Sequence, residues 1–337
     1  MLVIRRWLPI VLLTVVCAFI ALLSRTNYST LIRGHDSKEV KPKNDTLMGG
    51  TPVAGLAMNT TCSQSSLDLA RPSTDQDSGK YCTPTLVVPR MKDDDISWMD
   101  ELTGSLHFDI YIADDFAAAA HPPTNKGHEV MIYLTYIIDH YDKLPEAVIF
   151  MHAHRRTHHN NDLLDFDAVE MIKRLRMDHV LKQGYFNMRC GWLPGCPQWL
   201  DASGGHEVMN KQEQAVLSES WQELFPLDPL PPNLAQPCCS QFAVSRQRIQ
   251  SIPRSRYIFW RDWVMKTPLT NYVSGRIWEY SWHYLFTRES VFCPAEHVCY
   301  CDGFGLCFES QEVYRTFREL NSTQKENFLR SKEFDSH

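Results

Sequence analysis

The stretch KGHEVMIYLTYIIDHYDKLPEAVIFMHAHR, residues 126–155, decides the fold class because a helix and a strand follow each other within it. Its first part carries apolar and aromatic residues at helical spacing: Val130, Leu134, Ile137, Ile138 and Tyr141. The spacing predicts a helix over Lys126–Lys143, begun by Asn125 or Thr124 as a cap and ended by Pro145. The run Ala147–Met151 (AVIFM) is short and apolar throughout, which predicts a strand covered on both faces.

Further elements lie on both sides of this helix and strand. Upstream, we predict strands at Thr85–Pro89 and Phe108–Ala113, with a helix at Ile96–Leu102 between them. Downstream, we predict the helices Asp165–Leu175, Gln212–Leu224, Arg254–Lys266 and Thr270–Phe286, and a strand at Gln241–Val244. Strands that alternate with helices indicate a parallel sheet with right-handed crossovers. The predicted fold is therefore α/β, with a single mainly parallel sheet flanked by helices.

Composition places the chain among ordinary globular proteins. It has 337 residues, of which 44% are hydrophobic and 22% charged, and its formal net charge is −6. A nucleic-acid-binding domain would present a strongly basic face, so we expect no nucleic-acid partner.

The N-terminal region predicts a membrane anchor followed by a stem. Residues 7–23 are uncharged and flanked by arginines, and as a helix they would span roughly 25 Å. A cleaved signal peptide is the alternative, but no small-x-small cleavage pair follows the apolar run. We therefore predict a cytosolic tail at 1–6, an anchor at 7–23, a stem at 24–83 that is flexible and disordered, a domain at 84–310 and a tail at 311–337.

Glycosylation sequons and cysteines predict the side of the membrane on which the domain lies. Four sequons follow the apolar run, at Asn27, Asn44, Asn59 and Asn321. Apart from Cys17 in that run, ten cysteines remain, an even number that suits an oxidising compartment. We expect a single-pass type II glycoprotein of the Golgi or ER membrane with a luminal domain, the cell surface being an alternative.

The densest group of chemically active side chains follows the strand Ala147–Met151. His152 and His154 can bind a divalent metal, and Arg155 and Arg156 can bind phosphate oxygens. Open α/β sheets place their ligands at the carboxyl ends of strands, where this group begins. The alternative is a polar surface loop.

Two further groups are candidates for substrate binding. Asn125, Gly127 and Glu129 lie at the start of the predicted helix, where free backbone N–H groups suit an anion. Glu129 at that position is also explained by the helix dipole alone. Asp114 and Asp115 follow a predicted strand and are candidates for metal or ribose binding, although such pairs are also common in turns.

The last predicted helix carries a charged stripe. Arg276, Glu279 and His283 fall on one side of it, opposite two tryptophans. These residues are a candidate base with its orienting partners. A solvated helix face is equally compatible with the pattern.

The cysteines are predicted to be structural. Cys190 and Cys196 suit a small loop closure, and two disulfides are favoured over zinc within the group Cys293, Cys299, Cys301 and Cys307. The neighbours Cys238 and Cys239 are expected to have distant partners rather than each other.

The chain resembles a fungal family known only as domain of unknown function 3431. The resemblance runs from Asn125 to Cys307 through these segments, in order: NKGHEVMIYLTYIIDHYDKLP, HAHR, GYFNMRCGWLPGCP, CCSQFAVSRQRI, SGRIWEYSWHYLF and CP…CYCDGFGLC. That family has no assigned activity, so this resemblance does not settle the function.

A fainter resemblance is to glycosyltransferase-like proteins of the rhamnan-synthesis type. It rests on Asn-x-Gly-x-acid at a helix start, then Tyr-Asp, then a strand that ends in His. It implies a nucleotide-sugar-transferase-like fold in which an Asp-x-Asp at a strand end holds the metal that neutralises a diphosphate. Here His152-Ala153-His154 stands at that place, a departure that puts metal dependence and activity in doubt.

Together these features predict a type II glycosyltransferase-like protein, with a nucleotide sugar and a glycan acceptor as its partners besides the membrane. Mn²⁺ or Mg²⁺ would be its metal, and Glu279 or His283 the acceptor-side base. A catalytically silent glycan-binding or adaptor protein is the non-enzymatic alternative. A metal-dependent hydrolase built on His-x-His is a third interpretation, disfavoured because its best-known version needs a (β/α)₈ barrel.

Overall fold

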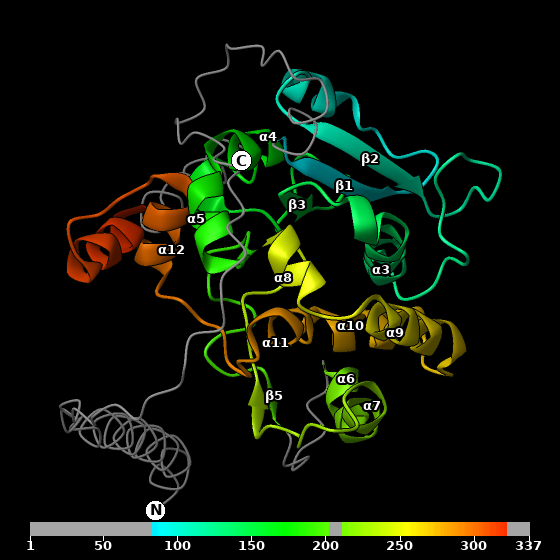
Figure 1. The fold of residues 1–337 in the computed structure, drawn as a ribbon. Coiled ribbons are helices and arrows are strands. Elements are labelled where there is room, and N and C mark those ends of the chain that lie inside the picture. Colours follow the sequence, from blue (N-terminus) through cyan, green and yellow to red (C-terminus); the bar gives the residue numbers. More distant parts are fainter. Residues whose placement is uncertain (1–82, 202–210, 322–337) are drawn as a thin grey trace, which may run out of the picture. The chain divides into compact units, whose positions relative to one another are not determined.

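The computed structural model describes residues 83–201 and 211–321, drawn in colour in Figure 1. The predicted anchor, most of the stem and the sequons at Asn27, Asn44 and Asn59 lie outside these residues, and Asn321 is the last of the described ones. Within the described part of the chain, no helix has both the length and the apolar character needed to cross a membrane.

A mixed five-stranded sheet forms the centre of the domain. Its strands, in spatial order, are β2 (His107–Ile112), β1 (Thr85–Arg90), β3 (Ala147–Phe150), β7 (Phe242–Ser245) and β4 (Tyr185–Asn187). β2, β1 and β3 run parallel to one another, but β7 is antiparallel to both β3 and β4. The predicted α/β class with flanking helices is confirmed, whereas half of the pairings are antiparallel, so the sheet is mixed rather than mainly parallel.

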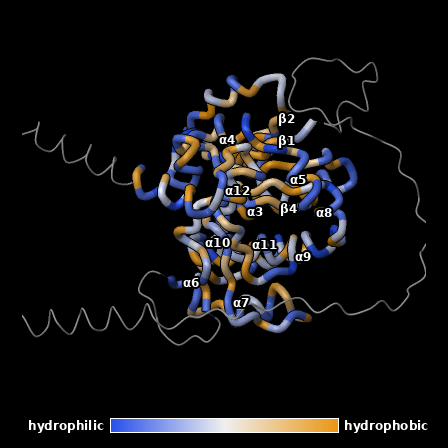
Figure 2. Tube along the Cα trace, turned by 90° about the vertical axis from the view of Figure 1, so that its left-hand side faces the viewer, coloured by the Kyte–Doolittle hydropathy of each residue, from blue (hydrophilic) through white to orange (hydrophobic). Residues whose placement is uncertain are grey.

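Strand β3 is apolar throughout, and β7 is apolar up to its last residue, because each contributes side chains to two cores. In β3, Val148 and Phe150 join one buried cluster, while Ala147 and Ile149 join the other. β7 alternates in the same way, since Phe242 belongs to the first cluster and Ala243 to the second. Figure 2 shows the hydrophobic stretches gathered towards the middle of the domain.

Helices cover both faces of the sheet (Figure 1). The first core is shared by α3 (Glu129–His140), α7 (Leu217–Leu224), α9 (Arg254–Lys266), α10 (Asn271–Glu279) and α11 (Trp282–Thr287). The second is shared by η1 (Ser97–Leu102), α4 (Ala168–Arg174), α5 (Met177–Gln183) and α12 (Glu296–Phe304). The short elements are η2 (Tyr141–Lys143), η3 (Asp162–Leu164), α6 (Gln212–Ala215), α8 (Arg246–Gln250) and the paired strands β5 (Leu200–Asp201) and β6 (Asn233–Leu234).

Helix α3 begins later than its sequence pattern predicts. Gly127 and His128 have φ angles of 70° and 54°, outside the right-handed helical region, so the helix starts at Glu129. A Cβ atom at Gly127 would lie 2.8 Å from Cγ1 of Val264, which explains why glycine is needed where α3 and α9 meet. The predicted caps Asn125 and Thr124 therefore precede a non-helical turn.

The single helix predicted over Thr270–Phe286 is two helices. α10 ends at Glu279 and α11 begins at Trp282. The hydroxyl of Ser281 donates to the Ile277 carbonyl at 2.7 Å, a side-chain bond that competes with regular helix hydrogen bonding. The break separates His283 from the face that carries Arg276 and Glu279.

The disulfide pairing differs from the predicted one. Cys190 bonds Cys299, Cys196 bonds Cys293, and Cys301 bonds Cys307. The predicted Cys190–Cys196 link is therefore wrong, because each cysteine reaches across the fold to the C-terminal group. The neighbours Cys238 and Cys239 bond each other, contrary to prediction.

The domain does not end at residue 310. Residues 311–321 are helical, and Tyr314 is buried, with its hydroxyl donating to Oε2 of Glu296 at 2.7 Å. Arg318 pairs with Asp162. The first part of the predicted tail is thus packed against the domain.

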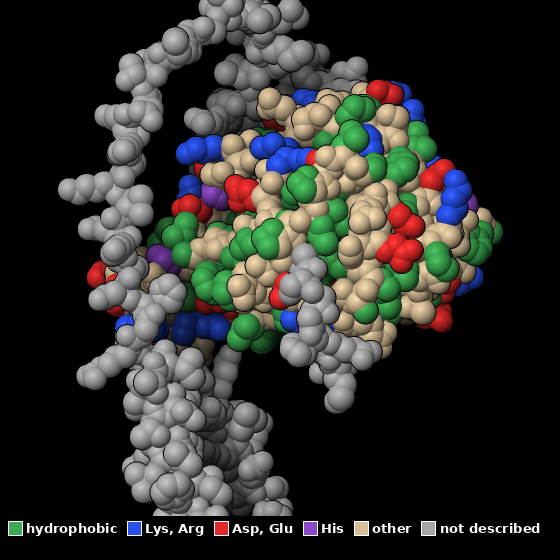
Figure 3. All heavy atoms as spheres, turned by 90° about the horizontal axis from the view of Figure 1, so that it is seen from below, with side chains coloured by type: hydrophobic (Ala, Val, Ile, Leu, Met, Phe, Trp, Pro, Cys, Tyr) green, Lys and Arg blue, Asp and Glu red, His purple; other side chains and the backbone are tan. Residues whose placement is uncertain are grey.

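On the face seen in Figure 3, basic and acidic side chains are interspersed rather than gathered into one broad patch.

Candidate functional site

The candidate site lies at the edge of the sheet where the parallel strands end. His152 follows β3 directly, and β7 is antiparallel to β3, so the segment 236–241 that leads into β7 reaches the same edge. α3 begins at this edge as well, because it connects the end of β2 to the start of β3. Three segments that are distant in sequence therefore meet where open α/β sheets place their ligands.

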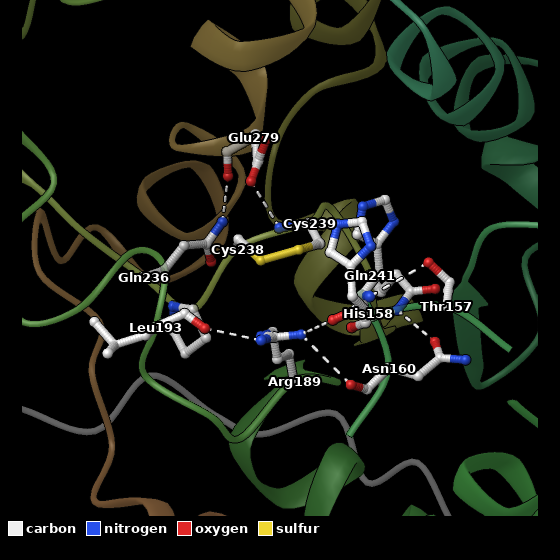
Figure 4. The surroundings of a disulfide bond; sticks show 12 residues. Thr157, His158, Asn160, Arg189, Leu193, Gln236, Cys238, Cys239, Gln241 and Glu279 are labelled. Carbon is white, nitrogen blue, oxygen red and sulfur yellow. Dashed lines mark hydrogen bonds between the residues drawn. A yellow bond between two sulfur atoms is a disulfide. The ribbon is translucent and has the colours of Figure 1, made fainter. Parts of the chain in front are cut away.

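The backbone of Cys239, whose side chain forms a disulfide with Cys238 (Figure 4), contacts two of the candidate side chains. The backbone N–H of Cys239 donates to Oε1 of Glu279 at 2.8 Å. The carbonyl oxygen of the same residue lies 2.7 Å from Nε2 of His152. Cys239 has a φ of 92°, rare for a residue with a side chain, and this conformation directs its two backbone groups to opposite partners. The disulfide loop therefore bridges the strand end and α10.

Glu279 belongs to a buried group of charges. Its Oε2 accepts from Nη1 of Arg276 at 2.7 Å, and Arg276 also pairs with Oε1 of Glu213 at 3.2 Å. Glu279 is 8% exposed and Glu213 is fully buried. Burial raises the pKa of Glu279, opposed by Arg276 and by the Cys239 N–H, and Glu129 raises it further. A carboxylate with a raised pKa is suited to accept a proton near neutral pH.

The start of α3 lies beside this group. A Cβ atom at Gly275 would approach Cδ2 of His128 to 2.7 Å, so His128 packs directly on α10. Glu129 is near enough to act on the pKa of Glu279. Of the predicted trio at this helix start, Gly127 has a packing role and Glu129 acts on Glu279 through its charge. The Asn125 amide lies 4.0 Å from Sδ of Met91.

His152 and His154 have different surroundings. The ring of His152 lies against that of His159, with 4.8 Å between centroids, and bonds Cys239. His154 is exposed and lines a hollow of about 540 Å³ with Trp98, Glu101 and the acidic run 93–95. His152, which contacts the Cys239 carbonyl, and His154, which lines the hollow, are two positions apart in the chain.

Arg155 and Arg156 line the same hollow but already have acidic partners. Asp167 accepts from Nε of Arg155 at 3.0 Å and from Nη2 of Arg156 at 2.9 Å, and Glu101 also pairs with Arg155. The two arginine side chains remain 37% and 61% exposed. Asp167 in addition caps α4 by accepting from the Val169 N–H at 2.9 Å. The guanidinium groups are therefore held in place and still face solvent.

Asp114 and Asp115 act within the turns of the structure. Asp114 accepts from the Lys92 N–H at 2.8 Å, and Asp115 pairs with the Lys92 ammonium at 3.3 Å and accepts from the Ala117 N–H. These contacts fix the loop after β1 to the loop after β2. They correspond to the alternative in which the two aspartates stabilise a turn.

His283 does not join the group around Glu279. It is fully buried, and its Nε2 lies 2.9 Å from the Ser290 carbonyl oxygen. Burial lowers its pKa to about 4. A neutral, enclosed imidazole is a packing element, so of the predicted trio only Arg276 and Glu279 lie together.

Several residues of the site carry no obvious sequence signal. Gln241 accepts from the His152 N–H at 3.2 Å and donates to Oδ1 of Asn160 at 3.0 Å, both amide side chains being buried. Arg189 donates to the carbonyl oxygens of His158 and Leu193, below the disulfide in Figure 4. Glu213 lies 63 residues from Arg276. Segments quoted for the family resemblance include Arg189 and Gln241, but only the fold shows their contacts.

The potential metal ligands in the described part of the chain form one close group, and its chemistry does not suit a metal ion. Among residues 83–201 and 211–321, the group whose ligand atoms lie within 4.8 Å of one another is Cys238, Cys239 and Glu279. Its sulfur atoms are bonded to each other and are not thiolates. The predicted pair His152 and His154 is not part of such a group, and we derive no chemical step through Mn²⁺ or Mg²⁺.

The fold and the site define an α/β protein with a charged, disulfide-bridged site at the carboxyl edge of a mixed open sheet. The sheet is open and differs from the (β/α)₈ barrel of the best-known His-x-His hydrolases. Residues 86–302 match the family model described as "Protein of unknown function (DUF3431)", so the chain belongs to that family. Comparisons with curated proteins and with solved structures found no match.

Proposed function

We propose that this protein is a glycosyltransferase that transfers a sugar from a nucleotide sugar to a hydroxyl of a glycoprotein or glycolipid glycan. In this proposal residues 7–23 anchor it in the Golgi or ER membrane with the domain in the lumen. The observation that carries the proposal is the strand end after β3. There His154 faces a hollow of about 540 Å³ and His152 is linked through Cys239 to the buried carboxylate of Glu279.

The hollow is the proposed donor site. Its volume falls in the range of roughly 300–1,000 Å³ that is usual for small-ligand pockets. Its lining includes His154, Arg155 and Arg156, which suit a diphosphate, and the acidic run 93–95, whose carboxylates suit sugar hydroxyls. The ion pairs with Asp167 hold both guanidinium groups without burying them.

Glu279 is the proposed acceptor-side base. Its carboxylate takes the proton of the acceptor hydroxyl while that oxygen bonds the anomeric carbon of the donor sugar. The bond from the anomeric carbon to the diphosphate breaks, and the nucleoside diphosphate leaves with the electron pair. His154 and Arg156 stabilise the charge that develops on the leaving oxygens.

The test uses the full chain purified in detergent, a panel of nucleotide sugars and glycan acceptors, with and without Mn²⁺ or Mg²⁺. We expect release of nucleoside diphosphate that depends on acceptor, and Glu279→Gln to lower it by about 10²–10⁴-fold. Glu219→Gln, on the exposed side of α7, is the matched control and leaves the rate unchanged. Equal rates for Glu279→Gln and the control would exclude Glu279 as the base.

A catalytically silent glycan-binding protein is the second candidate, favoured by one observation. Arg155 and Arg156 already bind Asp167, and Arg155 also binds Glu101, so the cations that would neutralise a leaving diphosphate are partly satisfied. The same experiment separates the two. Glycan binding without nucleoside diphosphate release from any donor supports the silent protein and contradicts the transferase.

A further inference from the structure

Glu213 is a buried carboxylate that the proposed mechanism does not use. It lies in α6, is fully buried, and its Oε1 accepts from Arg276 at 3.2 Å. Its Oε2 has no hydrogen-bond partner in the structure. Burying a charged oxygen without a partner is costly, so a contribution to local stability alone does not account for this residue.

Arg276 is the group that connects Glu213 to Glu279. Its Nη1 donates to Oε2 of Glu279 at 2.7 Å, while its Nε and Nη2 face Glu213. One guanidinium therefore serves two buried carboxylates. Each carboxylate reduces the stabilisation that the single positive charge gives to the other, because the two anions repel each other across it.

The other charged groups near Glu279 do not replace Arg276 as the cation shared by Glu213 and Glu279. Glu129, at the start of α3, is a third carboxylate whose charge acts on Glu279. Lys211 is the second nearby cation, but it donates to the Trp199 carbonyl at 2.7 Å and interacts with Glu213 rather than with Glu279. The aromatic face of Tyr280 lies 5.3 Å from the Arg276 guanidinium and carries no charge.

We propose that Glu213 is a positioning residue that keeps Glu279 a competent base by competing with it for Arg276. With Glu213 present, Arg276 is held in orientation yet cannot fully neutralise Glu279, so the Glu279 carboxylate retains its affinity for a proton. Without Glu213, Arg276 would pair with Glu279 alone and stabilise its ionised form. This inference rests on the proposed role of Glu279.

The test measures the titration of Glu279 through folding stability, so it needs no transferase activity. The free energy of unfolding of the full chain is compared with that of Glu279→Gln at each pH. A buried carboxyl of raised pKa destabilises the fold progressively as pH rises from its unfolded pKa to its folded pKa. We call the pH interval between these two pKa values the window. Its upper end reports the folded pKa of Glu279.

We expect Glu213→Gln to move the upper end of the window down by about one pH unit, the size of effect that a removed neighbouring charge typically produces. Glu213→Asp keeps the charge but shortens its reach, and gives a smaller shift in the same direction. Glu219→Gln gives none. An unchanged window in Glu213→Gln overturns the inference.

If Glu213→Gln does not fold, Glu213→Asp decides alone, and the absence of a shift in that variant overturns the inference. The outcome is separable from the proposed function. If no donor is turned over but the window still shifts in Glu213→Gln, the transferase proposal is rejected. The competition between Glu213 and Glu279 for Arg276 is then still supported. Where turnover is present, the acid limb of its pH profile moves down with the window in Glu213→Gln.

Discussion

Cys239 donates its backbone N–H to Oε1 of Glu279 across 2.8 Å, and the side chain of the same residue is bonded to Cys238. Since Glu279 is the proposed base, this bond connects an oxidised cysteine pair to the chemistry of the site. The left-handed φ of Cys239 is costly for a residue with a side chain, so the donor is expected to move when the ring is opened.

Replacing both cysteines tests this connection. We expect Cys238→Ser/Cys239→Ser to lower donor turnover by about 10–100-fold, the effect of losing one hydrogen bond to a charged group. Stability should change little, because a link between neighbours closes almost no loop. Cys301→Ser/Cys307→Ser is the matched control, which removes a disulfide that does not contact Glu279. Equal turnover in the two double variants would show that the ring has no role at the site.

The longer disulfides are expected to dominate stability. Cys190–Cys299 and Cys196–Cys293 join residues 109 and 97 positions apart, whereas Cys301–Cys307 spans six. Loop-closure entropy predicts a loss of about 4–5 kcal/mol for either long link and about 2 kcal/mol for the short one. Denaturant unfolding of the paired Cys→Ser variants measures this, and a larger loss from the short link would contradict it.

The buried histidine His283 predicts a loss of stability in acid. Its pKa is lowered to about 4 by burial, so the unfolded chain binds a proton there that the folded chain does not. Stability is then fully present above pH 6.5 and falls as pH decreases towards 4, by roughly 2–4 kcal/mol in total. We expect a smaller fall over this interval in His283→Gln, measured as the slope of unfolding free energy against pH. Parallel slopes for the two proteins would refute the assignment.

Two residues near the end of β3, His154 and Ile149, are expected to respond differently to substitution by alanine. His154 is exposed and lines the hollow, so His154→Ala should lower turnover and leave the unfolding temperature unchanged. Ile149 is buried in β3, and Ile149→Ala should cost about 2–5 kcal/mol. Arg155→Ala is a poorer test, because it also releases Asp167 and Glu101. If His154→Ala unfolds as readily as Ile149→Ala, His154 has a structural role.

The sequence predicts best where local pattern and burial agree. Residues 147–151 are apolar at every position because β3 contributes side chains to both hydrophobic cores. β4 was missed because three residues carry too little periodicity, and the antiparallel direction of β7 is set by the route of the chain rather than by its composition. The late start of α3 depends on positive φ angles at Gly127 and His128 that helical spacing does not report.

The site was predictable to the extent that its residues are close in sequence. Arg276 and Glu279, three positions apart, were expected together and are in contact. Helical spacing puts His283 on the same face only if the helix is continuous, and Ser281 interrupts it. Glu213 joins the group through a tertiary contact that no spacing indicates. The Cys238–Cys239 bond was expected not to form, because neighbouring cysteines ordinarily have poor geometry for one.

The pairing of Cys190 with Cys299 has a consequence for biosynthesis. At about 5–20 residues per second, roughly 5–20 s pass between the synthesis of these two cysteines. Cys190 and Cys196 emerge together during that interval, six positions apart and without their native partners. Their most accessible early bond is with each other, and it must be reshuffled before the C-terminal cysteines can take their places. Maturation of this domain is therefore expected to depend on thiol–disulfide isomerisation in the compartment where it folds.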